Sequence, residues 1–186
     1  LARQSAQHPG DLFLDLLVEH GPRLRWRTVL ANHRPQVVAK LVAEPSTLIG
    51  FADSGAHIRN MAFYNFALRF LKLVRDAEAS GKPIMPIEKA VWRLTGELGE
   101  WFGVDAGLLT VGKRADIVVL DPQRLDDSLN QYHEAPMEAF GGLQRMVNRG
   151  SAVNHVLING RVAFSGESFA AELGQTRGFG QFLRAG

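Results

Sequence analysis

Apolar residues recur at helical spacing in four stretches of the first 105 residues. This period predicts helices over residues 11–20, 35–44, 60–79 and 86–102, each ended by glycine or proline. The third helix carries aromatic residues on one face, and we expect them to belong to the hydrophobic core; they are Phe63, Phe66 and Phe70.

Two shorter apolar runs in the same region have the length of strands. Residues 24–31 form the first run, and residues 47–52 form the second. The second run is continuously apolar, which is typical of a strand buried on both faces of a parallel sheet. Its length does not distinguish it from a short buried helix. The pattern therefore predicts strand, helix, strand, helix up to about residue 105.

The pattern changes near Gly107, where short β-branched runs separated by glycine and asparagine replace the helical period. One strand is predicted over residues 116–120. A hairpin is predicted over 153–165, because Asn159-Gly160 favours a two-residue turn. Residues 123–150 show no clear period and are long for a structureless loop, so we expect them to pack over something else.

These patterns predict an α/β fold with two parts. Residues 1–105 hold the alternating strands and helices, and residues 106–186 hold a separate, smaller β domain. A complete (β/α)8 barrel needs roughly 250 residues. If the first part belongs to such a barrel, this chain can hold only its closing units.

Composition excludes several classes of protein. The 186 residues are 46% hydrophobic and 22% charged, which is ordinary for a folded protein. The net charge is +2 and no lysine- or arginine-rich run is present, so no nucleic-acid partner is expected. No apolar run approaches the roughly 18 residues that span a bilayer, and no signal peptide follows Leu1. We therefore expect no membrane partner and a cytoplasmic location.

The sequence also excludes some chemistry and suggests a longer parent. Without cysteine, the chain has no disulfide framework and no thiolate metal site. Because Leu1 is not a start methionine, we expect the chain to be cut from something longer.

Asp53 is the first candidate for catalysis, because it directly follows the apolar run 47–52. In a barrel, groups that follow a strand lie at the face where catalytic residues collect. A carboxylate there can bind a metal or accept a proton from metal-bound water. The structural alternative is that Asp53 caps the following turn through the N–H groups of Ser54 and Gly55.

The residues after Asp53 offer further candidates. His57 can hydrogen-bond a substrate, orient Asp53 or end a loop. Ser54 is not interpreted as a nucleophile, since the sequence around it lacks a G-x-S-x-G elbow. Arg59 and Tyr64 are candidates for holding a substrate carboxylate. His33, which follows the run 24–31, is expected to be structural, and the remaining histidines show no mutual metal-ligand spacing; they are His8, His20, His133 and His155.

Four segments of the chain resemble the N-acyl-D-amino-acid deacylases (D-aminoacylases), a branch of the metal-dependent amidohydrolases. Ala52-Asp53-Ser54-Gly55-Ala56-His57 is similar to the family's small-Asp-x-Gly-x-His motif at the end of the eighth barrel strand. Ala31-Asn32-His33, followed by a helix that a proline opens, also resembles the family, and the segment 88–95 resembles its final barrel helix. Residues 107–121 resemble the strand pair by which amidohydrolases return to a small β-sandwich, and this motif identifies the fold better than the substrate.

The resemblance implies the closing portion of a (β/α)8 metal-dependent hydrolase barrel plus part of a small β-sandwich domain. It implies one or two divalent metals, usually zinc, and a small-molecule N-acyl amino acid as substrate. Asp53 is then a metal ligand and the group that takes a proton from the attacking water and delivers it to the leaving amine. His57, Arg59 and Tyr64 are the candidates for binding the substrate.

The resemblance also implies what this chain lacks. The family's His-x-His pair and its other metal ligands lie upstream, so most ligands are expected outside these residues and the chain alone should be inactive. Exposed strand edges and an apolar face should then associate with the missing N-terminal part of the same protein or with a second copy, as a homo-oligomer. Two alternatives stay open, a cyclic amidase of the dihydroorotase or hydantoinase type and a non-catalytic β module that binds a partner.

Overall fold

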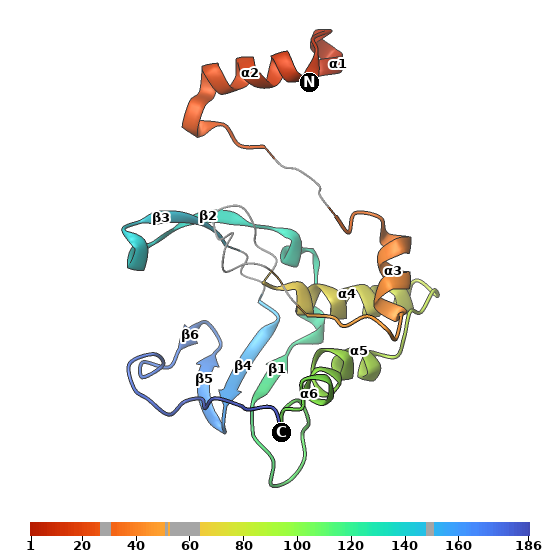
Figure 1. Ribbon diagram of the computed structural model, residues 1–186, viewed down its shortest axis with the longest axis vertical. Coiled ribbons are helices and arrows are strands. Elements are labelled where there is room, and N and C mark those ends of the chain that lie inside the picture. Colours follow the sequence, from red (N-terminus) through yellow and green to blue (C-terminus); the bar gives the residue numbers. More distant parts are fainter. Residues whose placement is uncertain (27–30, 51, 53–63, 148–150) are drawn as a thin grey trace. The chain divides into compact units, whose positions relative to one another are not determined.

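A computed structural model describes residues 1–26, 31–50, 52, 64–147 and 151–186 (Figure 1). These residues form two compact units, Leu1–Val38 and Ala39–Gly186. Each unit has its own internal packing and is described by itself. The first unit holds α1 (Ala2–Ser5), α2 (Pro9–His20), the short helix η1 (Gly21–Arg23) and the beginning of α3 (Pro35–Ala43).

The first predicted helix is confirmed as α2, and its ends follow from the local sequence. At its start, His8 Nδ1 accepts a hydrogen bond from a first-turn N–H at 3.2 Å, and Pro9 occupies the first helical position. At its end, Gly21 adopts a φ of 49°, which favours glycine. Beyond the helix, the ring of Trp26 lies edge-on to Phe13 with the two centroids 5.4 Å apart.

The second unit begins with a helical region. It contains the end of α3 and three further helices, α4 (Phe66–Ala79), α5 (Ile87–Leu94) and α6 (Gly96–Phe102). Helix α4 was predicted to begin at residue 60, but residues 60–63 lie outside the described residues. In the described part of the chain, no helix is both long enough and apolar enough to cross a membrane.

The sequence predicted one helix from Pro86 to Gly103, whereas the structure divides it at Thr95. The hydroxyl of Thr95 donates to the carbonyl of Val91 at 2.8 Å, and the backbone of Thr95 departs from helical geometry (φ −132°, ψ −85°). The second piece, α6, ends as predicted at Gly103, which has a φ of 63°. The Thr95 hydroxyl, which binds the preceding turn, therefore divides the helix, although the apolar residues continue at helical spacing through it.

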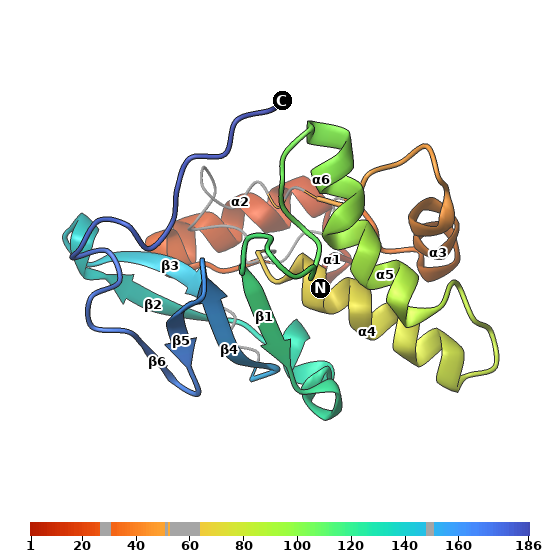
Figure 2. The ribbon, with the colours of Figure 1, turned by 90° about the horizontal axis from the view of Figure 1, so that it is seen from below.

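Four strands form an antiparallel sheet in the order β1-β4-β5-β6 (Figures 1 and 2). The predicted hairpin is confirmed within it, and Asn159 and Gly160 at its turn have φ values of 50° and 78°. The predicted strand over 116–120 is confirmed as β1. The four strands are β1 (Ile117–Leu120), β4 (Val153–Ile158), β5 (Arg161–Ser165) and β6 (Ser168–Phe169).

The stretch 123–150 contains structure that the sequence pattern missed. Its strands β2 (His133–Met137) and β3 (Leu143–Val147) pair with each other as a second antiparallel sheet. Three short 3-10 helices accompany them, η2 (Pro122–Arg124), η3 (Asp127–Asn130) and η4 (Glu138–Phe140). Leu125 and Leu129 from this stretch are buried, so the prediction that it packs over another part of the chain is confirmed.

The core of the second unit lies between the helical region and the strands. Val74 of α4 and Ala90 of α5 are fully buried, and Leu129 and Ala152 join the same cluster. The cluster also contains Phe70, as predicted for the aromatic face of α4. The cluster contains residues from both sides of the predicted domain boundary between residues 105 and 106. That domain boundary stays a prediction.

Two predicted strands are not strands in the described residues. Residues 24–26 and 31, and residues 47–50 and 52, lie in no strand. A strand of a parallel sheet needs neighbouring strands to pair its backbone groups, and the pairings in the described part of the chain are all antiparallel and lie after residue 116. The described residues thus give a mixed α/β structure with two antiparallel sheets, and the barrel portion stays a prediction.

Candidate functional site

Three of the four predicted site residues, Asp53, His57 and Arg59, lie outside the residues that the structure describes. The fourth, Tyr64, lies two residues before the start of α4 and is 44% exposed. The structure does describe the segment that leads to Asp53 and the helix that follows Tyr64. The surroundings of the candidate site can therefore be built from these two sides.

The segment before Asp53 is held by local hydrogen bonds and by packing. The hydroxyl of Thr47 lies 2.8 Å from the carbonyl oxygen of Leu41, and this contact closes the turn after α3. Ile49 packs against the core cluster. A Cβ atom at Gly50 would lie 3.6 Å from Leu98 Cδ1, so the backbone at Gly50 passes beside α6.

Arg93 on α5 ties the same segment to the helices. Its guanidinium is 1% exposed, and its Nε donates to Glu97 Oε2 at 3.0 Å. Its Nη1 and Nη2 atoms donate to the backbone carbonyls of Val42 and Thr47. Sequence reasoning missed Arg93, although its spacing of three from the buried Ala90 placed it on the inner face of α5.

Asn65 is a second residue that sequence reasoning missed. It is 8% exposed, and its Nδ2 donates to the carbonyl of Leu129 at 2.9 Å, which joins the start of α4 to η3. Among the described residues, its Oδ1 atom has no hydrogen-bond partner. No sequence motif marks this position, because the partner of Asn65 is 64 residues away along the chain.

Asp116, in the segment 107–121 that carries part of the resemblance, has a structural role. One carboxylate oxygen accepts a hydrogen bond from the backbone N–H of Asn159 at 2.7 Å, and the other accepts from Nε of Arg114. Burial raises the pKa of Asp116, but these two hydrogen bonds outweigh it and the net pKa is lowered. The carboxylate therefore joins the start of β1 to the turn between β4 and β5.

The described residues contain no metal centre. Nowhere in these residues do three His, Cys, Asp or Glu side chains gather closely enough to hold an ion. His33 is exposed, and His8 is the cap of α2. The predicted ligand Asp53 lies outside the described residues, so its part in a metal site stays a prediction.

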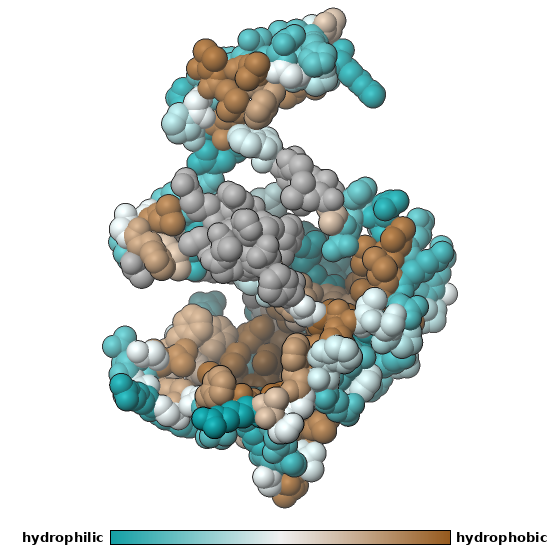
Figure 3. All heavy atoms as spheres, viewed as in Figure 1, coloured by the Kyte–Doolittle hydropathy of each residue, from teal (hydrophilic) through white to brown (hydrophobic). Residues whose placement is uncertain are grey.

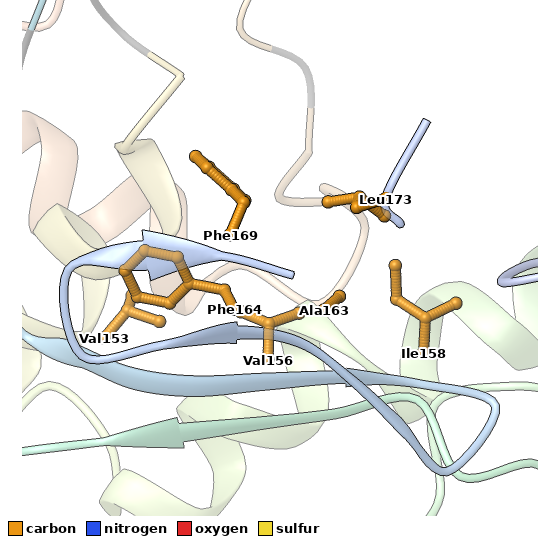
Figure 4. Close-up of a pocket in the computed structure, with 7 residues that line it drawn as sticks. All are labelled: Val153, Val156, Ile158, Ala163, Phe164, Phe169 and Leu173. Carbon is orange, nitrogen blue, oxygen red and sulfur yellow. The ribbon is translucent and has the colours of Figure 1, made fainter. Parts of the chain in front are cut away.

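A hollow of about 310 Å³ lies against the four-stranded sheet, and Figure 3 shows hydrophobic side chains gathered over this region. In Figure 4 the side chains of β4 and β5 rise toward Phe169 and Leu173. All of the lining residues are apolar; they are Val153, Val156, Ile158, Ala163, Phe164, Phe169 and Leu173. This hollow offers no acid, base or ligand, so it can bury an apolar group but cannot perform the predicted hydrolysis.

The chain is similar to proteins whose own function is uncharacterized. Uncharacterized proteins of Mycobacterium tuberculosis and Mycobacterium bovis are 52% identical to it over 192 residues. The match covers 100% of this chain but only 31% of each relative, so the chain spans about a third of the length of the curated relatives it matches. No protein-family model matches the chain. No solved structure matches it either.

Proposed function

We propose that this chain is part of a metal-dependent amidohydrolase that cleaves the linear amide of an N-acyl-D-amino acid. Asp53 is its catalytic group and one of its metal ligands. His57, Arg59 and Tyr64 bind the substrate. The proposal rests on the motif around Asp53 and on the order of the segments that follow it.

The observation that carries the proposal is the arrangement of the segment 112–121. It leaves the helical region after α6, opens β1 and fixes the β4–β5 turn through Asp116. A return from helices to a small antiparallel sheet at this point is what the resemblance implies. The length of the mycobacterial relatives also supports the proposal, because a chain that spans 31% of them leaves room for further ligands elsewhere.

Asp53 is proposed to act as a proton carrier. Its carboxylate accepts a proton from the attacking water and delivers it to the amine that leaves. A divalent ion, usually zinc in this family, would lower the pKa of a bound water toward about 7 when present. The described residues do not form a metal site by themselves. The resemblance assigns the other ligands to the remainder of a longer protein.

The apolar sheet face supports a larger assembly. The hollow lined by Phe164 and Phe169 exposes apolar surface that a folded protein normally buries. We propose that the N-terminal part of the same protein covers it, in a cytoplasmic enzyme. A second copy of the chain, as a homo-oligomer, is the alternative partner for this face.

The test is the activity of the full-length protein that contains this chain. We expect zinc by elemental analysis and turnover of N-acetyl-D-amino acids. Asp53→Asn should lower kcat by at least about tenfold, because asparagine keeps the shape and cannot accept the proton. Asp116→Asn is the matched control and should keep kcat, since Asp116 holds a turn.

The same assay separates the proposal from its rivals. Turnover of cyclic ureides in place of N-acyl-D-amino acids would identify a dihydroorotase- or hydantoinase-like cyclic amidase. Absence of any turnover in zinc-loaded protein would favour a non-catalytic β module. Retention of more than about a tenth of kcat in Asp53→Asn would place the general base elsewhere.

A further inference from the structure

We infer that Arg93 is a positioning residue for Asp53, because it fixes the segment from which the chain runs into the proposed active site. This inference rests on the proposed function. It does not concern a contact with substrate or metal. It concerns the backbone of residues 42–50, which the structure describes.

The burial of Arg93 is the first argument. A guanidinium that is 1% exposed loses nearly all of its hydration, and that loss is costly unless charge and hydrogen bonds replace the water. Glu97, whose side chain is 15% exposed, supplies the opposite charge at 3.0 Å. The two remaining nitrogens bind the carbonyls of Val42 and Thr47, so each guanidinium nitrogen has a partner.

The positions of the two carbonyls are the second argument. Val42 lies in the last turn of α3, where a carbonyl has no partner within the helix, and a cation is favourable at this end of the helix. Thr47 begins the apolar run that leads to Asp53. One planar group therefore binds both the end of α3 and the start of this run, in addition to the contact between Thr47 and Leu41. A lysine can replace the charge but cannot bind both carbonyls in the same plane.

The continuity of the anchored segment is the third argument. After Thr47, Ile49 packs against the core and Gly50 passes beside Leu98 of α6. The contacts with α5 and α6 thus extend to a residue three positions before Asp53. Since a displacement of about 1 Å in a reacting group can lower a rate by about 100-fold, loss of this anchor should affect catalysis.

Arg75 provides a matched control with the same chemistry at another place. It lies on α4, pairs with Asp76 at 2.6 Å and donates to the carbonyl of Pro122 at 2.8 Å. Like Arg93, it binds a carboxylate close to it in the sequence and a backbone carbonyl of a distant segment, although its side chain is 36% exposed. The segment that it ties is η2, which does not lead to Asp53.

The experiment compares Arg93→Lys and Arg75→Lys in the full-length protein. Turnover of an N-acetyl-D-amino acid gives kcat and KM, and amide hydrogen exchange reports on residues 44–50. For Arg93→Lys we expect kcat to fall by about 10- to 100-fold with KM nearly unchanged, and exchange over 44–50 to accelerate. For Arg75→Lys we expect kcat and the exchange of 44–50 to match the wild type.

Glu97→Gln is a second, milder variant that still tests the inference if Arg93→Lys does not fold. It keeps a hydrogen-bond acceptor for Arg93 Nε and removes only the negative charge, so we expect a smaller fall in kcat in the same direction. Equal kcat in Arg93→Lys and the wild type would overturn the inference. An equal fall in kcat for both lysine variants would also overturn it, because the effect would then be one of general stability.

Failure of the proposed function is distinguishable from failure of this inference. If the wild type does not hydrolyse N-acyl-D-amino acids, the proposed function fails, and the exchange experiment still decides whether Arg93 is the anchor. Faster exchange over 44–50 in Arg93→Lys would support the anchor. Unchanged exchange would overturn the inference whatever the activity of the wild type.

Discussion

Two regions of residues 39–186 use apolar side chains in opposite ways. Under α4 and α5, Val74 and Ala90 are fully buried and Leu129 is 1% exposed. On the four-stranded sheet, Phe169 is 72% exposed and Val162 is 50% exposed. The first region completes its packing with described residues of this chain. The second presents apolar surface that needs a cover from another source.

Strand β1 indicates that its part of the sheet is built for burial on both faces. An antiparallel sheet with one face in water normally alternates apolar and polar residues. Strand β1 has no such alternation, because its residues 117–120 are Ile-Val-Val-Leu. Within β1, the adjacent side chains of Val118 and Val119 point to opposite faces of the sheet, and these residues are 56% and 40% exposed. The sequence of β1 thus fits a larger structure than the described residues provide.

The largest effect is expected in the buried region. Leu129→Ala removes a side chain from a filled core, so it should lower the free energy of unfolding by about 2–5 kcal/mol. Leu109→Ala is the matched control, because Leu109 is 79% exposed and should cost less than about 0.5 kcal/mol. Denaturant unfolding of the full-length protein measures both. Equal costs for the two leucines would show that Leu129 does not belong to a filled core.

A smaller effect is expected on the sheet of the 186-residue chain, and it should grow in the full-length protein. In the 186-residue chain, Phe169→Ala removes an edge-on contact with Phe164 at 5.2 Å, which is worth about 0.5–1.5 kcal/mol. In the full-length protein, a covered Phe169 should cost about 3–5 kcal/mol, as buried phenylalanines do. Unfolding experiments on both forms give the difference. The same cost in both would mean that the rest of the protein does not cover this face.

The elements that the sequence predicted are those with local causes. The β4–β5 hairpin depends on Asn159-Gly160, and α6 ends where Gly103 adopts a positive φ. Strand β2 has no comparable signal, since Pro136 and the charged Glu134 interrupt its apolar pattern, although it pairs with β3 as a hairpin across η4. The buried Phe179, over which the Arg161 guanidinium lies at 4.1 Å, was missed because glycines surround it in the sequence.

The candidate site likewise has one part with a local sequence signal and one part without such a signal. The motif around Asp53 is local, so the sequence identified it, although the structure does not describe Asp53, His57 and Arg59. Arg93 acts on carbonyls 46 and 51 residues away, and no sequence period reports such a contact. The described residues of the predicted strand over 47–52 lie in no strand, for a related reason. An apolar run becomes a strand only beside other strands, and that depends on the rest of the fold.

The smallest predicted effect concerns Asp116, and it depends on pH. Its lowered pKa means that its stabilising contribution is complete above the unfolded pKa of about 3.9 and is lost as the pH falls through the lower folded pKa. Asp116→Asn should therefore cost about 1 kcal/mol at pH 7, and wild type and variant should converge below about pH 4.

Asp105→Asn is the control, because its ion pair with Lys113 is exposed and worth little. Denaturant titrations from pH 3 to 7 measure the convergence, and kcat should be unchanged in both variants. A cost that persists at low pH would mean that Asp116 acts through shape, and a large loss of kcat at unchanged stability would give it a part in the chemistry.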